Sequence, residues 1–245
     1  MKPLRAVCFD IDGTLYPKWM FAVNMALMAF PSIALARRYR RFRATIRLEQ
    51  ENPTVPANQK GFRLRQARSI LEQDDMPTDE HALEVLMNRI ELQFYRRWDR
   101  KWLFMLPFRH LHKAMCSIRK HGMMIGVLSD FSIGRKLRAL GVEDLVDISM
   151  CSEESGYLKP HSAPFDMLSQ RLNVDSESIL YVGDSYEKDI VGASRAGMTT
   201  CLIDPKARRA DVREVLARRY PLADMIIGGY DELIHWFEES STGGA

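Results

Sequence analysis

Short apolar runs recur along the chain, and most are followed by a stretch in which apolar residues repeat at helical spacing. Such runs, bounded by polar residues, are typical of buried strands in a parallel sheet. We predict strands at Ala6–Asp10, Met124–Ser129, Asp147–Cys151, Ile179–Asp184, Thr200–Ile203 and Asp224–Ile227. We predict helices between and after them at Leu106–His121, Ser132–Leu140, Pro164–Leu172, Tyr186–Ala196, Arg209–Arg218 and Tyr230–Glu238. This alternation indicates an α/β fold with a doubly wound parallel sheet, a Rossmann-like core.

The interval between the first two strands departs from this alternation, because it contains only amphipathic helix patterns. They cover Lys18–Glu49 with a break near Pro31, Lys60–Gln73 and Asp79–Trp102, and residues 52–56 and 76–78 are predicted loops. We therefore predict an inserted all-helical domain at residues 17–106, within a core made of residues 1–16 and 107–245. Residues 240–245 are predicted to form a flexible tail.

Charge is divided unevenly between these two parts. Residues 17–106 carry a net charge of +6, which leaves −3 for the remainder of a chain whose total is +3. Ten basic and two acidic residues lie between Arg37 and Arg68. Such a cluster attracts anions. We interpret it first as a solvated helix face and next as a surface for an anionic substrate. Nucleic acid and anionic lipid rank last, because few aromatic residues interleave with the basic ones.

The stretch Trp19–Ala36 is unusually apolar and precedes this basic run, a pattern similar to a short membrane segment. Asn24, Pro31 and Ser32 argue against a span, so we favour a buried helix over peripheral membrane contact.

The cysteines and the N-terminal residues indicate in which cellular compartment the protein is expected. The four cysteines have no metal-binding spacing, and the first ten residues lack the apolar core of a secretion signal. Free thiols favour a reducing environment, so we expect a cytoplasmic protein. The sequence does not predict its oligomeric state.

Two carboxylates end the first predicted strand, in the sequence Asp10-Ile11-Asp12-Gly13-Thr14. Open α/β sheets bind their ligands at this edge. Side chains alternate along a strand, so Asp10 and Asp12 would diverge in a regular one. Gly13 allows a sharp turn that brings both carboxylates to one bound group. A nucleophile and a proton-transfer partner need that arrangement.

Further polar residues fall at or just after later strands: Ser129, Lys159, Asp184 and Asp189. A hydroxyl and an ammonium group can hold phosphoryl oxygens, and carboxylates provide the oxygen ligands that Mg²⁺ prefers. The cation would let an anionic Asp10 approach a phosphate. These residues predict a site for a small phosphorylated molecule.

Taken in order, these residues resemble the motifs of the haloacid dehalogenase-like hydrolase superfamily over the whole chain. The matching segments are Asp10-x-Asp12-Gly13-Thr14-Leu15, Ser129, Lys159-Pro160, and Gly183-Asp184-Ser185 with Asp189. The helical insertion resembles the family's C1-type cap. Asp130 departs from the pattern, because many relatives have Asn or Gly after the serine, and so does the segment 161–165.

The resemblance implies a role for each matching residue. Asp10 is expected to be the nucleophile that forms an aspartyl-phosphate, and Asp12 the acid and base. Ser129 and Lys159 are expected to bind the phosphoryl group. The expected Mg²⁺ ligands are Asp10, the backbone carbonyl of Asp12, and Asp184. Asp189 would contact the metal, stand close behind it, or orient Lys159.

The sequence therefore predicts a Mg²⁺-dependent phosphatase for a small phosphomonoester, with specificity in the cap. Dehalogenases of this superfamily typically lack an acid at the place of Asp12, so its presence favours phosphoryl transfer. The alternative enzyme is a phosphomutase with the same motifs. The alternative of another class is a non-catalytic binding or regulatory module that acts through its basic cap. The identity of the substrate is not predicted.

Overall fold

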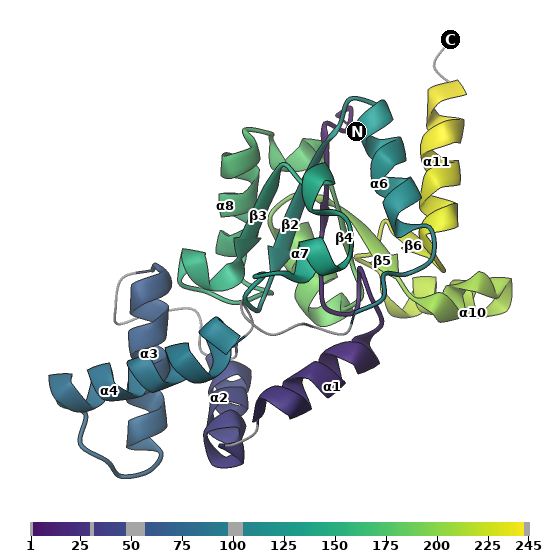
Figure 1. Ribbon diagram of the computed structural model, residues 1–245. Coiled ribbons are helices and arrows are strands. Elements are labelled where there is room, and N and C mark those ends of the chain that lie inside the picture. Colours follow the sequence, from purple (N-terminus) through teal and green to yellow (C-terminus); the bar gives the residue numbers. More distant parts are fainter. Residues whose placement is uncertain (1, 30–31, 48–56, 98–104, 243–245) are drawn as a thin grey trace.

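One sheet of six parallel strands organises the computed structural model, which describes residues 2–29, 32–47, 57–97 and 105–242. The strand order is β3-β2-β1-β4-β5-β6 (Figure 1). The strands are β1 (Ala6–Phe9), β2 (Met124–Ser129), β3 (Ile148–Cys151), β4 (Ile179–Gly183), β5 (Thr199–Ile203) and β6 (Met225–Ile227). Each lies within one residue of its predicted bounds. The predicted doubly wound α/β fold is confirmed.

The register of the central strands brings the polar segments together. Phe9 of β1 lies level with Val127 of β2 on one side and with Val182 of β4 on the other. The residues that follow these three strands therefore leave the sheet at one edge. This edge is the carboxyl side of a parallel sheet, where such folds place their ligands.

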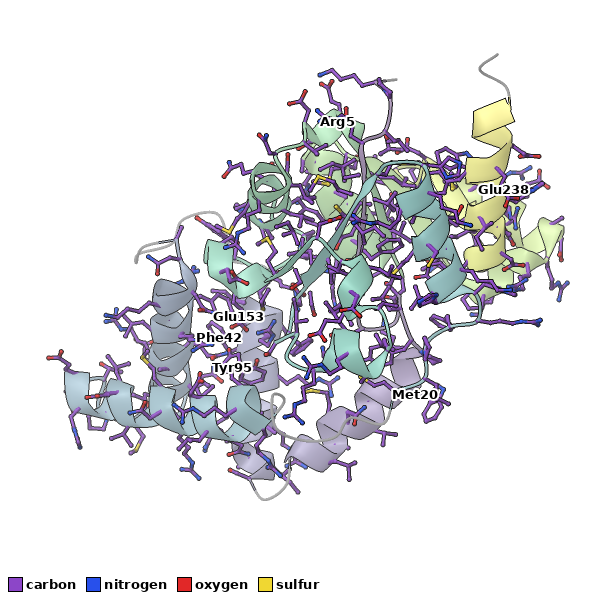
Figure 2. The ribbon with its side chains drawn as sticks, turned by 45° about the horizontal axis from the view of Figure 1, so that its top comes forward. Arg5, Met20, Phe42, Tyr95, Glu153 and Glu238 are labelled. Atoms are coloured by element: carbon purple, nitrogen blue, oxygen red, sulfur yellow. The ribbon has the colours of Figure 1, made fainter. Side chains whose placement is uncertain are left out.

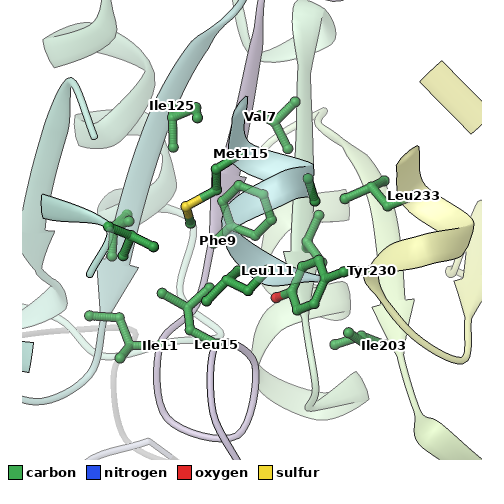
Figure 3. Packing of buried hydrophobic residues seen from close by; sticks show 14 of the residues in the cluster. Val7, Phe9, Ile11, Leu15, Leu111, Met115, Ile125, Ile203, Tyr230 and Leu233 are labelled. Atoms are coloured by element: carbon green, nitrogen blue, oxygen red, sulfur yellow. The ribbon is translucent and has the colours of Figure 1, made fainter. Parts of the chain in front are cut away.

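Apolar residues alternate between the two faces of the sheet, and helices cover both. Val7 and Phe9 pack with α6 (Leu111–Lys120) and α11 (Tyr230–Thr242), as Figure 3 shows. Ala6 and Cys8 pack on the opposite face with α8 (Ala163–Leu172) and α9 (Val191–Arg195). Burial on both faces explains why the strands are continuously apolar.

The remaining helices around the sheet are short or peripheral. They are α7 (Lys136–Ala139) and α10 (Ala210–Arg219), the single turns η2 (Glu143–Leu145), η3 (Ser152–Ser155), η4 (Ser176–Ser178) and η6 (Pro205–Arg208), and the π-helical turn η5 (Tyr186–Ile190).

The named elements in the described part of the interval between β1 and α6 are all helical. They are α1 (Lys18–Ala29), α2 (Ile33–Ile46), α3 (Gln59–Glu72), α4 (Glu80–Ile90) and the π-helical turn η1 (Glu91–Tyr95). The Asn58 side chain caps α3, and the Asp79 side chain caps α4. A separate apolar cluster, which includes Leu35, Phe62 and Ile90, holds α2, α3 and α4 together. We call this unit the cap.

The two ends of the cap meet at the core. The backbone N–H of Phe108, after the cap, donates to the carbonyl of Leu15, before it, at 2.9 Å. Leu15, Met20 and Met105 are buried in the main apolar cluster of the core. The insertion therefore leaves and re-enters the core at one place.

Three predicted helix boundaries are wrong. Helix α6 begins at Leu111 rather than Leu106, because His110 before it has a positive φ of 67°. The segment predicted as helix from Ser132 contains Gly134 at φ 46°, and only α7 is helical there. Helix α11 continues through Thr242, into the predicted tail.

Some predictions fall outside the described ranges. They are the loop at 52–56 and the ends of the helices predicted to reach Glu49 and Trp102. Residues 243–245 of the predicted tail also lie outside them. Within the described ranges, no helix is both long and apolar enough to cross a membrane.

Candidate active site

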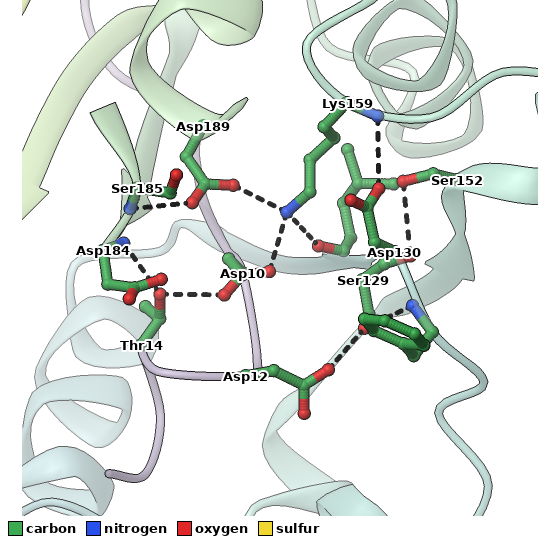
Figure 4. A network of polar contacts seen from close by, with 12 residues as sticks. Asp10, Asp12, Thr14, Ser129, Asp130, Ser152, Lys159, Asp184, Ser185 and Asp189 are labelled. Atoms are coloured by element: carbon green, nitrogen blue, oxygen red, sulfur yellow. Dashed lines mark hydrogen bonds and ion pairs between the residues drawn. The ribbon is translucent and has the colours of Figure 1, made fainter. Parts of the chain in front are cut away.

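Asp10 stands directly after β1, and its two carboxylate oxygens have different partners. Lys159 Nζ lies 2.7 Å from Oδ1, and the hydroxyl of Thr14 donates to Oδ2 at 3.0 Å (Figure 4). The side chain is almost fully buried. These contacts fix the orientation of the carboxylate at the sheet edge.

The turn after β1 is fastened to the loop after β4. The backbone N–H of Asp184 donates to the hydroxyl of Thr14 at 3.0 Å. Gly13 has φ +113°, and a Cβ placed there would lie 2.5 Å from Asp184 Oδ2. A glycine is therefore required both by the backbone conformation and by the close approach of the two loops.

Three carboxylates converge at this edge. Oxygens of Asp10, Asp184 and Asp189 all lie within 4.8 Å of one another. Burial, reinforced by Asp10, raises the pKa of Asp184. Burial also raises the pKa of Asp189 to about 7, although Lys159 opposes the shift. Three carboxylates offer the hard oxygen ligands that Mg²⁺ prefers.

Lys159 is the ammonium group within this cluster. Its Nζ lies 2.6 Å from Asp189 Oδ1, 2.7 Å from Asp10 Oδ1 and 3.2 Å from the hydroxyl of Tyr181. Burial alone lowers the pKa of Lys159, but the attraction of Asp10 and Asp189 outweighs it and holds that pKa well above its usual value. Lys159 is therefore a fixed positive charge beside Asp10.

Asp12 points away from this cluster. Lys136 Nζ lies 2.7 Å from both of its carboxylate oxygens, and the hydroxyls of Ser129 and Tyr16 donate to it. The structure thus brings Asp10, Lys159, Asp184 and Asp189 together and places the side chains of Asp12 and Ser129 in a neighbouring network. The expected metal contact of Asp12 through its backbone carbonyl remains a prediction.

Lys136 is a site residue that the sequence analysis missed. It is fully buried although it is a lysine on the short helix α7. Its partner Asp12 is 124 residues away along the chain, so no local pattern reveals the pair. In the sequence, only its position a few residues after Ser129 indicates that Lys136 could belong to the site.

Asp130 is the residue that departs from the family pattern described above. It connects the loop after β2 with Lys159 and with Arg47. Its Oδ1 accepts from the backbone N–H of Lys159 at 3.1 Å, and its Oδ2 accepts from Arg47 at 2.8 Å. Arg47 also donates to the backbone carbonyl of Lys159 at 3.2 Å. Burial would raise the pKa of Asp130, but Arg47, Lys159 and Arg43 outweigh it and hold that pKa far below its usual value.

A buried ion pair joins the cap to the core beside this site. Arg43 of α2 pairs with Glu153 of η3 and donates to the backbone carbonyl of Asp130. The hydroxyl of Tyr95 donates to the other oxygen of Glu153 at 2.7 Å (Figure 2). The guanidinium also lies over the ring of Phe131, 4.4 Å from its centroid. Arg43 and Glu153 are 2% and 0% exposed, so part of the basic run faces the core.

The residues around Asp10 line a small, partly open pocket of about 60 Å³. Lys18 and Phe21 of α1 line it from the cap side, and Lys18 Nζ lies 2.9 Å from Asp184 Oδ2. The core contributes the remaining lining residues Asp10, Asp12, Asp130, Phe131, Lys159, Asp184, Ser185, Lys188 and Asp189. This volume is well below the usual 300–1,000 Å³ of pockets that hold a whole small ligand.

Sequence comparison identifies a family and a group of relatives. Residues 4–197 match the family model described as haloacid dehalogenase-like hydrolase. A glyceraldehyde 3-phosphate phosphatase of Methanopyrus kandleri is 28% identical over 82% of this chain and 84% of its own. A ribulose-1,5-bisphosphate 5-phosphatase of Halopiger xanaduensis is 26% identical over 82% of this chain and 84% of its own.

Solved structures share the fold. A 2-haloacid dehalogenase of Pseudomonas syringae is 23% identical, covers 99% of this chain and 100% of its own, and has a TM-score of 0.60. A β-phosphoglucomutase of Clostridium difficile is 15% identical, covers 98% of each chain and has a TM-score of 0.58. Dehalogenase and mutase therefore have the same architecture, and fold alone does not select the reaction.

Proposed function

Because the chain belongs to the haloacid dehalogenase-like hydrolase family, we propose that it is a Mg²⁺-dependent phosphatase of small phosphomonoesters. The single observation that carries the proposal is the convergence of the Asp10, Asp184 and Asp189 carboxylates, with Lys159 in contact with Asp10 and Asp189. The names of its sequence relatives support a phosphatase over a dehalogenase.

Asp10 is the nucleophile in this proposal. One carboxylate oxygen bonds to phosphorus while the bond from phosphorus to the leaving-group oxygen breaks, which gives an aspartyl-phosphate and an alcohol. Lys159 and the Ser129 hydroxyl hold phosphoryl oxygens and stabilise their negative charge. Thr14 keeps the second oxygen of Asp10 in place.

Asp12 moves the protons. It gives a proton to the leaving-group oxygen in the first step and takes one from water in the second. The attack of that water breaks the bond between Asp10 and phosphorus, releases inorganic phosphate and restores the carboxylate. Asp12 lines the same pocket as Asp10 and is held by Lys136.

The carboxylates of Asp10 and Asp184, with Asp189 as a third donor or close behind, would hold Mg²⁺. When bound, the cation supplies charge neutralisation, so that an anionic carboxylate can approach an anionic phosphate. The four free cysteines support a reducing compartment, and we propose the cytoplasm.

The test is phosphate release from a panel of phosphomonoesters, with and without Mg²⁺, for the wild type and Asp10→Asn. We expect metal-dependent release that the substitution abolishes. Asp144→Asn, at an exposed position, is the matched control. An isomeric phosphate in place of free phosphate would show a mutase. Absence of turnover on every ester, with salt-sensitive binding of an anionic partner, would show a binding module.

A further inference from the structure

The backbone of Lys159 is held by two side chains that take no part in the proposed chemistry. Asp130 Oδ1 accepts from the backbone N–H of Lys159 at 3.1 Å, and Arg47 Nε donates to its backbone carbonyl at 3.2 Å. The two side chains also bind each other, because Arg47 Nη2 donates to Asp130 Oδ2 at 2.8 Å. These contacts close a ring around one residue of the site. We call Asp130 and Arg47 the clamp.

The clamp joins the cap to the core. Arg47 is the residue that ends α2 in the cap, whereas Asp130 directly follows β2 of the core sheet. The guanidinium of Arg47 also donates to the carbonyl of Arg43 at 2.9 Å, one turn earlier, which ties it to the helix. The side chains of Arg47 and Asp130 are 19% and 7% exposed, so water screens this pair less than an ordinary surface pair. The docked cap and the backbone of Lys159 are therefore in direct contact.

The side chain of Lys159 extends this connection to the reacting group. Its Nζ lies 2.7 Å from Asp10 Oδ1 and 2.6 Å from Asp189 Oδ1 (Figure 4). The position of this ammonium group depends on the backbone from which the side chain starts. A misplacement of about 1 Å in such a group can cost about a hundredfold in rate. The clamp is thus placed to affect catalysis without touching the substrate.

The clamp needs an aspartate at position 130, where many members of the family have asparagine or glycine. An asparagine keeps one oxygen for the backbone N–H of Lys159, but its amide group would present a donor to the donor Arg47. A glycine offers neither contact. Only a carboxylate accepts from both partners at once, so the departure from the family pattern has a physical consequence in this chain.

We propose that Asp130 and Arg47 are positioning residues for Lys159, and that through them the docked cap sets the place of the ammonium group that binds the transferring phosphoryl group. The inference rests on the proposed phosphatase function. Because the clamp acts on the phosphoryl side of the site, its loss affects every ester to the same degree. A cap residue that touches only the leaving group would instead discriminate between esters.

The test compares Arg47→Met and Asp130→Asn with the wild type on two esters that differ in their leaving group, 2-hydroxyethyl phosphate and CMP, with Mg²⁺ present. For each variant we expect kcat/KM to fall about tenfold to a hundredfold, by the same factor on both esters. Titration calorimetry with inorganic phosphate and Mg²⁺ gives a readout that needs no turnover. The dissociation constant of phosphate should rise several-fold, since this anion binds the same ammonium group.

The double variant shows whether the two side chains act together. Once Arg47 is replaced by Met, Asp130→Asn should cost little more, so the losses should be non-additive. Arg47→Lys should recover only part of the activity, because an ammonium group lacks the planar fork that binds two acceptors. Arg38→Met is the matched control, because Arg38 lies on the same helix and pairs with Asp74 of the cap at 2.9 Å. Its kcat/KM should stay within about twofold of the wild type.

Denaturant unfolding of each variant separates positioning from stability. Asp130→Asn preserves the shape of the side chain and keeps the test available if Arg47→Met does not fold. Folded variants with lower stability but unchanged kcat/KM and phosphate affinity would reduce the clamp to a structural contact and overturn the inference. A loss on one ester alone, or strictly additive losses, would also overturn it.

In each of these cases the wild type still releases phosphate, and the proposed function stands. No release by the wild type from any ester of the broad panel would remove the proposed function and this inference with it.

Discussion

Asp10 and Asp12 are neighbours in sequence, yet each belongs to a different polar network. Asp10 contacts Lys159, whereas both oxygens of Asp12 contact Lys136. The two acids therefore have separate lysine partners. In the proposed mechanism Asp10 is the nucleophile and Asp12 transfers protons, so each proposed role has its own lysine contact.

Lys136 is a positioning residue for Asp12, and its removal should impair proton transfer. For Lys136→Met we expect kcat to fall about tenfold to a hundredfold, within the usual contribution of a positioned acid or base, with KM little changed. The pH profile of kcat should also shift. Lys136→Arg should recover part of the activity. Steady-state kinetics of the three proteins from pH 5 to 9 test this, and a rise in KM with unchanged kcat would contradict it.

Lys18 should compete with a cation for Asp184, because its Nζ lies 2.9 Å from the carboxylate. The lysine side chain is 64% exposed, so the pair is weak. We expect Lys18→Met to bind Mg²⁺ a few-fold more tightly, measured by titration calorimetry, with Lys206→Met as control. Weaker binding would show that Lys18 supports the metal site instead.

At the scale of elements, the position of the site follows from strand ends that the sequence reveals. The runs that end near Asp10, Ser129 and Asp184 are apolar because both faces of their strands are buried. The positions of these strands along the chain could therefore be predicted. The sheet edge at which these residues meet followed from them. The insertion could be recognised because its helices lack intervening strands.

The cap–core contacts could not be predicted in the same way. Arg43 lies in a run of arginines typical of a solvated helix face, yet it is buried against Glu153. The two residues are 110 positions apart, and both are charged in a pattern that suggests exposure. The ion pair is recognised only in the three-dimensional structure, where α2 packs on η3. By contrast, the late start of α7 has a local cause in the sequence, because Gly134 adopts a positive φ just before it.

The buried pair of Arg43 and Glu153 should matter for stability chiefly when it is broken. Arg43→Met leaves Glu153 without its cation and should lower the free energy of unfolding by about 3–5 kcal/mol. Glu153→Gln in the same chain should recover part of this loss. Denaturant unfolding of the wild type, both single variants and the double variant measures the coupling. Strictly additive losses would mean that the two charges do not interact.

Asp130 should make stability depend on pH. Its pKa is far below the usual value in the folded protein, so its contribution is complete above about pH 4, the value of an unfolded aspartate. The contribution is lost progressively as the pH falls below that. The difference in unfolding free energy between the wild type and Asp130→Asn should therefore shrink from pH 5 to pH 3. The exposed Asp144→Asn should show no comparable trend.

At the scale of the whole molecule, the cap restricts the space above the site. The pocket of about 60 Å³ accommodates a phosphoryl group and a few further atoms. We expect two- and three-carbon phosphomonoesters to be hydrolysed with a kcat/KM about a hundredfold above that of a nucleoside monophosphate, because misplacement of the reacting group is costly. Kinetics with 2-hydroxyethyl phosphate and CMP provide the comparison. Equal values would mean that the cap moves away during turnover.

The hydrogen bond between Phe108 and Leu15 places the entrance and the exit of the cap side by side. A segment with adjacent ends can be replaced by another of different length without a change in the strands that flank it. During evolution, one continuous stretch of gene could thus be exchanged as a cassette while Asp10 and its partners were inherited intact. New substrates would then arise by recombination at the two adjacent ends of the insertion, rather than by slow remodelling of the sheet.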